Sequence, residues 1–255
     1  MKHVSTFGRR CWFALLALGL LSGCTSADYG PTVNAIGLTG ARARFATVGD
    51  AMYVIDGGWL RVFDLNASST GLPVPVQSLG LNYSIETIYP VGSSLFVGTS
   101  AGMYLYDISQ PLQPQRVGYY AQAASCDPLV VHGRWAYLTT RQDRACGSAA
   151  NQLQVVDLVD PARPTLARTY PLTHPYGLAI DSSYLMVCDE GLKVFDLSAP
   201  PALTQLDAFQ ADAYEATTTP AGLLLTGKNG LYQCRYDARG RSLRVLSVIP
   251  VVPRP

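Results

Sequence analysis

Three carboxylic residues are the candidates for acid–base chemistry, because each stands where an apolar run is about to begin. They are Glu86, Asp127 and Glu215. Two carboxyl groups about 5 to 9.5 Å apart, one of them with a raised pKa, can act as acid and base on a glycosidic bond. The sequence therefore leaves open an enzymatic alternative, in which a glycan hydrolase or lyase uses two of these residues.

Tyrosines and arginines occupy comparable positions and favour binding. Two tyrosines also precede apolar runs, where their rings offer flat stacking surfaces for sugars or peptides. The loop from Arg141 to Ala150 carries the only cluster of alternating charge. Because ligands favour concave sites with a few convergent polar groups, we expect one ligand-binding rim. Its residues are Arg44, Glu86, Asp127, Arg141, Arg144, Tyr176, Tyr214 and Glu215.

The short motifs that mark common catalytic centres are missing from the sequence. There is no phosphate loop, no Gly-x-Ser-x-Gly elbow, no His-Glu-x-x-His and no calcium loop. Of the three histidines, His3 lies in the amino-terminal segment, so His132 and His174 alone cannot make a multi-histidine metal site. We therefore expect no metal and no cofactor, and we favour a non-catalytic binding protein over an enzyme.

The amino terminus has the layout of an export signal. Lys2, Arg9 and Arg10 precede an uncharged apolar run from Cys11 to Leu21, which is too short to span a bilayer. The run ends in Leu21-Ser22-Gly23-Cys24, which resembles the lipobox of bacterial lipoproteins. The resemblance implies a signal peptide over residues 1–23, fatty acyl chains on Cys24 as the membrane anchor, and a tether over 24–38. Thr25 replaces the inner-membrane Asp signal, which implies the outer membrane in a Gram-negative host.

The charge balance argues against nucleic acid as a partner. The whole chain has 19 basic and 18 acidic residues, and the signal contains three basic residues and no acidic one. The mature chain is thus 16 − 18 = −2, and no basic stripe marks it. The expected partners are the membrane, through the lipid, and an envelope protein or glycan.

Four cysteines remain after the signal and the lipidation site. An exported protein meets an oxidising compartment in which disulfides persist. Cys126 and Cys146 are expected to reach the same face and to form a disulfide, worth about 3 kcal/mol in the chain-entropy picture. Cys188 and Cys234 lie inside apolar runs and are expected to be buried thiols.

Five similar segments recur along the chain, each apolar-rich and closed by an aspartate. The closing residues lie 43, 50, 39 and 41 residues apart, which is typical of one four-stranded propeller blade per repeat. A carboxylate that recurs at the end of every such strand is expected to accept the N–H groups of its own turn, rather than to catalyse. These residues are Asp64, Asp107, Asp157, Asp196 and Asp237.

Each repeat also has the same internal order: an apolar strand, a second strand after a tight turn, the strand that ends in aspartate, and a short outer strand after a proline-marked turn. This order predicts an all-β propeller of about five four-stranded antiparallel blades. The turns between second and third strands should bring polar residues to the rim, namely Asp56, Asp189, Glu190, Lys228 and Asn229. Pro31 to Leu38 is a candidate closing strand.

The repeats resemble those of the LVIVD family of β-propellers, named for a run that Leu153-Gln154-Val155-Val156-Asp157 approximates. The resemblance covers roughly Gly40 to Pro250 and implies a single propeller domain over residues 39–255. Its blades would span about 39–81, 82–122, 123–172, 173–209 and 210–250. The family implies binding rather than a defined reaction, so we expect a membrane-anchored interaction platform in the cell envelope.

The lipobox generates the first testable prediction. Replacing Cys24 with Ala removes the only thiol placed to take the diacylglycerol, so the variant should accumulate unprocessed or be released from membranes. Metabolic labelling with a radioactive fatty acid, followed by membrane fractionation, checks this. Normal processing and undiminished membrane retention of the variant would refute lipidation at this residue.

Overall fold

The computed structural model describes residues 44–121, 128–142 and 150–251, which belong to one compact unit of the chain. Several predicted features therefore lie outside the described residues. These are the signal, Cys24, the candidate closing strand 31–38, Cys126, Asp127, Arg144 and Cys146.

Twenty strands make up the described structure, and they form five sheets. The first sheet contains β1 (Phe45–Val48), β2 (Ala51–Asp56), β3 (Trp59–Asp64) and β4 (Val74–Gly80); the second contains β5 (Ile85–Val91), β6 (Ser94–Thr99), β7 (Gly102–Asp107) and β8 (Gln115–Ala121). The third contains β9 (Leu129–His132), β10 (Trp135–Thr140), β11 (Gln152–Asp157) and β12 (Thr165–Pro171). The fourth contains β13 (Pro175–Asp181), β14 (Tyr184–Asp189), β15 (Leu192–Asp196) and β16 (Thr204–Phe209); the fifth contains β17 (Glu215–Thr219), β18 (Gly222–Thr226), β19 (Gly230–Asp237) and β20 (Ser242–Pro250).

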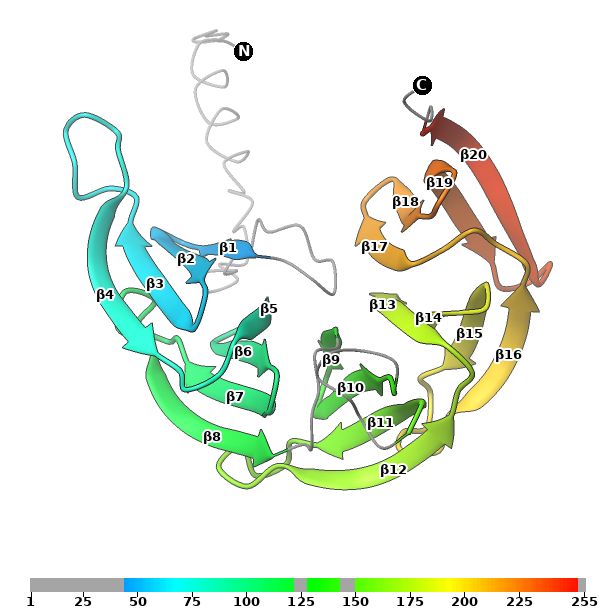
Figure 1. Ribbon diagram of the computed structural model, residues 1–255, viewed down its shortest axis with the longest axis horizontal. Helices are drawn as coiled ribbons and strands as arrows, with labels where there is room; N and C mark the ends of the chain where they lie inside the picture. Colours follow the sequence, from blue (N-terminus) through cyan, green and yellow to red (C-terminus); the bar gives the residue numbers. More distant parts are fainter. Residues whose placement is uncertain (1–43, 122–127, 143–149, 252–255) are drawn as a thin grey trace, which may run out of the picture. The chain divides into compact units, whose positions relative to one another are not determined.

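Each sheet consists of four strands that follow one another in sequence and pair antiparallel. The first strand of each sheet is innermost and the fourth outermost (Figure 1). The inner strands contact their counterparts in the next sheet, from β5 to β9, β9 to β13 and β13 to β17. This arrangement confirms the predicted all-β propeller of five four-stranded blades.

Burial explains why the second strands of the middle blades are continuous apolar runs in the sequence. In β6, β10 and β14, every residue after the first is buried. These strands are covered on both faces, so both sets of alternating side chains are mostly apolar. In β2 of the first blade burial alternates instead, with Ala51, Tyr53 and Ile55 buried and their neighbours partly exposed.

The aspartates that close each third strand have the structural role predicted for them. In all five, the Oδ1 atom accepts a hydrogen bond from the backbone N–H two residues later, over 2.8 to 3.0 Å. The donors are Asn66, Ser109, Val159, Ser198 and Arg239. The recurrence of the carboxylate therefore reflects five copies of one turn.

A β-bulge recurs at one position in every blade, between the third and fourth strands. The register shifts at Val62/Phe63, Leu105/Tyr106, Val155/Val156, Val194/Phe195 and Gln233/Cys234. A bulge adds one residue to the outer strand and increases the local twist. The fourth strands run for six to nine residues and are longer than the short outer strands predicted from the sequence.

Tyrosine hydroxyls join two pairs of adjacent blades. Tyr53 of the first blade donates to the carbonyl of Pro111 in the second over 2.6 Å, and Tyr170 of the third donates to Pro201 of the fourth over 2.7 Å. The acceptors lie in the proline-marked turns, whose carbonyls are left free by the strand ladder. The prolines thus provide contact points between blades as well as turns.

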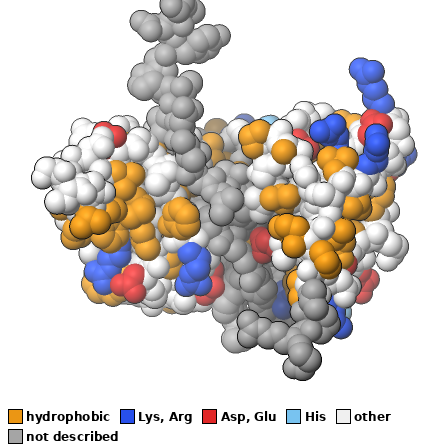
Figure 2. Space-filling model, turned by 90° about the horizontal axis from the view of Figure 1, so that it is seen from above, with side chains coloured by type: hydrophobic (Ala, Val, Ile, Leu, Met, Phe, Trp, Pro, Cys, Tyr) orange, Lys and Arg blue, Asp and Glu red, His pale blue; other side chains and the backbone are white. Residues whose placement is uncertain are grey.

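The surface of the described chain is lightly charged and carries exposed apolar side chains. Figure 2 shows hydrophobic side chains among charged ones of mixed sign, without an extended patch of one sign on the described part of that face. None of the described segments is a helix long and apolar enough to cross a membrane.

Gly118 in β8 generates a prediction about blade packing. A Cβ at this residue would lie 1.9 Å from the carbonyl oxygen of Pro161 in the next blade. The Gly118→Ala variant should lose about 1 to 3 kcal/mol of unfolding free energy, because the backbone of one blade must move away from the other. Urea denaturation measures the loss. Val117→Ala is the control, because Val117 is 42 % exposed and its truncation should cost under about 0.5 kcal/mol; equal costs would contradict the packing argument.

Candidate functional site at the beginnings of the inner strands

The strand register aligns the polar residues predicted to form the rim. Ile88, Leu178 and Ala216 each pair with the fourth residue of the following strand, namely Val97, Val187 and Leu225. Glu86, Tyr176 and Tyr214 each lie two residues earlier in their blades. They therefore occupy equivalent positions at the beginning of the inner strands β5, β13 and β17.

Three of the predicted residues come together in a stacked cluster. The Cζ atom of Arg141 lies 4.2 Å from the centroid of the Tyr176 ring, and the Tyr176 and Tyr214 rings are 5.1 Å apart and tilted by 51°. Arg141 and Tyr176 are partly buried, whereas Tyr214 is 43 % exposed. The cluster, which we call the Arg-Tyr-Tyr cluster, joins the third, fourth and fifth blades and presents an aromatic surface to solvent.

Hydrogen bonds to their backbone carbonyls hold the two tyrosines in place. The N–H of Gly177 donates to the Tyr214 carbonyl over 2.8 Å, and the Thr139 hydroxyl donates to the Tyr176 carbonyl over 3.0 Å. A Cβ at Gly177 would lie 2.7 Å from the Cα of Glu215. Glycine at this position is therefore what lets β13 approach β17 closely enough for the rings to meet.

A buried carboxylate fixes the segment that leads into β13. Asp189, at the end of β14, is 1 % exposed and accepts hydrogen bonds from the N–H groups of Thr173 and His174. It also pairs with the ammonium group of Lys193 over 2.5 Å. The expectation that Asp189 is one of the polar groups displayed at the rim is wrong, because those backbone donors and Lys193 draw it into the interior, where only a fully paired carboxylate is tolerated.

Asp212 plays the matching role for β17 and was not singled out from the sequence. Its carboxylate accepts the N–H groups of Lys228 and Asn229 over 2.8 and 2.6 Å. Partial burial alone would raise the pKa of Asp212, but the donors on Asn229 and Lys228 together outweigh it and hold the pKa below its usual value. The two carboxylates thus tie the segments that carry Tyr176 and Tyr214 to neighbouring turns of their own blades.

The base of the loop that follows Arg141 is also anchored. The Thr140 hydroxyl donates to the Ala150 carbonyl over 2.7 Å. Asn151 accepts from the N–H of Gln142 and donates to the carbonyl of Thr173 over 2.6 Å, which links this blade to the next. The position of Arg141 beside Tyr176 therefore rests on hydrogen bonds from both ends of the loop.

The remaining predicted residues have separate surroundings. Arg44 is exposed just before β1, and Glu86 accepts a hydrogen bond from the hydroxyl of Ser84 over 3.0 Å. Glu215 is partly buried near Cys188; burial, with a smaller contribution from Glu215, raises the pKa of that thiol. Asp127 and Arg144 lie outside the described residues, so the carboxylate pair needed by the enzymatic alternative stays a prediction.

Two further sequence predictions concern thiols and metals. Cys188 and Cys234 are both free and buried, which confirms their assignment as interior thiols. Within residues 44–121, 128–142 and 150–251, no group of three or more His, Cys, Asp or Glu side chains could hold a metal ion.

Comparison with solved structures supports the overall fold alone. A protein from Lactobacillus plantarum, solved in a structural-genomics programme, aligns with a TM-score of 0.62 at 15 % identity over 78 % of this chain and 67 % of its own. A protein described as functionally unknown, from Desulfotomaculum acetoxidans DSM 771, aligns with a TM-score of 0.63 at 10 % identity over 78 % and 66 %. This chain thus spans about two thirds of each neighbour. No protein-family model and no curated protein match the sequence.

Asp212 generates a prediction about pH. A carboxyl group whose folded-state pKa is depressed stabilises the fold above its unfolded pKa of about 3.9, and the stabilisation is lost as pH falls through the folded-state pKa. The Asp212→Asn variant, which cannot ionise, should be less stable than the parent by about 1 kcal/mol at pH 7, and the difference should vanish near pH 2.

Thermal unfolding followed by circular dichroism between pH 2 and 7 measures this convergence. Asp50→Asn is the matched control, because the Asp50 side chain is exposed and forms no hydrogen bond within the described chain. Curves for Asp212→Asn and the parent that stay parallel at every pH would show that the ionised carboxylate is not the stabilising species.

Proposed function

We propose that this chain is a lipid-anchored propeller of the LVIVD type that binds a glycan or protein ligand of the cell envelope without catalysis. The observation that carries the proposal is the Arg-Tyr-Tyr cluster. An arginine and two tyrosines from three blades are held by structural hydrogen bonds, yet the ring of Tyr214 stays substantially open to solvent. Aromatic surfaces of this kind stack on sugar rings and on peptide side chains.

Each part of the proposal rests on a different kind of evidence. The membrane anchor rests on the lipobox pattern around Cys24. The family rests on the repeated strand ending and on the five blades in which it recurs. The non-catalytic character rests on the absence of catalytic motifs from the sequence and on the structural use of the recurring aspartates.

Preorganisation favours binding at this cluster. The segments on either side of Tyr176 and Tyr214 are already tied down by Asp189 and Asp212. Binding of a ligand to Tyr214 therefore loses no conformational entropy through the ordering of these segments, which makes association more favourable. The cation–π contact from Arg141 fixes the second ring at the same time.

The proposal predicts that Tyr214→Ala abolishes ligand capture, or weakens it at least fivefold, without unfolding the protein. The test uses the full-length chain in detergent micelles on an array of bacterial envelope glycans, and photo-crosslinking from residue 214 in intact cells. Tyr83→Ala is the matched control, because Tyr83 is also 43 % exposed but lies outside the cluster. If the folded parent captures nothing in either assay, or if Tyr214→Ala captures as well as Tyr83→Ala, the proposal is wrong.

A further inference from the structure

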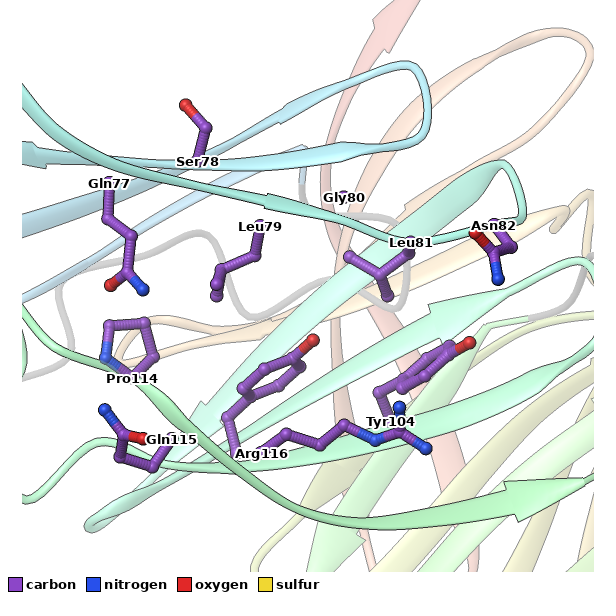
Figure 3. A pocket seen from close by; sticks show the side chains of 11 residues that line it. Gln77, Ser78, Leu79, Gly80, Leu81, Asn82, Tyr104, Pro114, Gln115 and Arg116 are labelled. Carbon is purple, nitrogen blue, oxygen red and sulfur yellow. The ribbon is translucent and has the colours of Figure 1, made fainter.

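A hollow lies far from the inner strands, between the outer parts of the first and second blades. It has a volume of about 370 Å³ and is bordered by β4 on one side and by β7 and β8 on the other (Figure 3). This volume falls in the lower range of small-molecule sites. The lining residues with polar side chains are Gln77, Ser78, Asn82, Tyr104, Tyr106, Gln115 and Arg116.

Arg116 is the only charged residue among the residues that line this hollow. Its Cζ atom lies 4.9 Å from the centroid of the Tyr104 ring and 5.9 Å from that of Tyr119, so the guanidinium is held over two aromatic rings. Figure 3 shows the Arg116 side chain running beneath Tyr104 along the wall formed by β7 and β8. Stacking restricts the side chain but uses none of its N–H donors.

Those donors have no partner within the described chain. Arg116 makes no hydrogen bond or ion pair there, whereas other arginines of the propeller are neutralised. Arg61 pairs with Asp56, Arg134 with Asp157, and Arg241 with Asp207. A preorientated guanidinium with free N–H groups is suited to bind a carboxylate through two parallel hydrogen bonds.

The fold does not require an arginine at this position. Arg116 pairs with Tyr106 next to the bulge that recurs in every blade, and the equivalent residues in the other four blades are Pro75, Leu166, Gln205 and Val245. Blades therefore form with apolar or neutral side chains there. Among the five blades, only the second has an arginine at this position.

The rest of the lining adds neutral hydrogen-bonding groups. Gln77 and Asn82 project from the β4 side toward β7 and β8 (Figure 3), and their side-chain amides form no hydrogen bond within the described residues. Amides donate and accept, which matches hydroxyl groups on a ligand. A single cation in the lining balances one negative charge rather than the two of a phosphate monoester.

We propose that this hollow binds an acidic sugar of the hexuronate class, with the carboxylate on Arg116 and the hydroxyl groups on Gln77 and Asn82. The site is separate from the Arg-Tyr-Tyr cluster and does not depend on the function proposed for it. Loss of Tyr214 should therefore leave hexuronate binding unchanged.

The test is isothermal titration calorimetry of the full-length chain in detergent micelles with glucuronate, glucose and acetate. Glucuronate should bind at least tenfold more tightly than glucose, which lacks the charge, and than acetate, which lacks the hydroxyl groups. Arg116→Gln should weaken glucuronate at least tenfold, and Asn82→Ala severalfold, with unchanged circular dichroism. Arg168→Gln is the matched control, because Arg168 also stacks on a tyrosine of an outer region, Tyr170, at 5.4 Å.

Three results would overturn the proposal. The first is no heat of binding with glucuronate in the folded parent. The second is equal affinity for glucuronate and acetate, which would leave no role for the sugar hydroxyls. The third is an Arg116→Gln variant that binds like the parent, or an Arg168→Gln variant that loses binding to the same extent.

Discussion

Each middle blade has two apolar faces, and only the neighbouring blades on either side can cover them. That burial is the dominant favourable contribution to folding. It fills the interior positions of β6, β10 and β14 with side chains that cannot also serve a ligand. Groups available for recognition are consequently confined to the beginnings of the inner strands and to the outer edges between blades. The Arg-Tyr-Tyr cluster occupies the first kind of place, and Arg116 the second.

Features that repeat along the chain could be predicted from the sequence. The closing aspartate stabilises a turn within four residues, so its role is local. Asp64 and Asp237 both accept the N–H two residues later, although they belong to the first and last blades. The alternation of strands and turns likewise predicted five blades. Counting back from the second strands was enough to align Tyr176 with Tyr214, since the repeat keeps a constant register there.

Features that depend on contacts between residues distant in the sequence could not be predicted in the same way. Nothing in the local sequence distinguishes Asp189, which the backbone of the preceding link draws inside, from an exposed turn aspartate. Asp212 acquires its partners 16 and 17 residues away. The position of Arg116 in the lining of the hollow depends on the register at the bulge and on β4 lying opposite. In each case the surroundings of the residue depend on contacts with residues distant in the sequence, and the repeated motif does not specify those contacts.

The assembly of every described blade from four consecutive strands has a consequence for how the molecule acquires its structure. Strand pairs close over short stretches of chain, so little entropy is lost before each hairpin is stabilised. The strands of a blade can pair as soon as its own segment of about 40 residues is available, and the neighbouring blades then stabilise it by covering its apolar faces. Folding can thus advance from blade to blade in the order of synthesis, and an additional blade could be inserted by gene duplication without breaking an existing hydrogen-bond ladder.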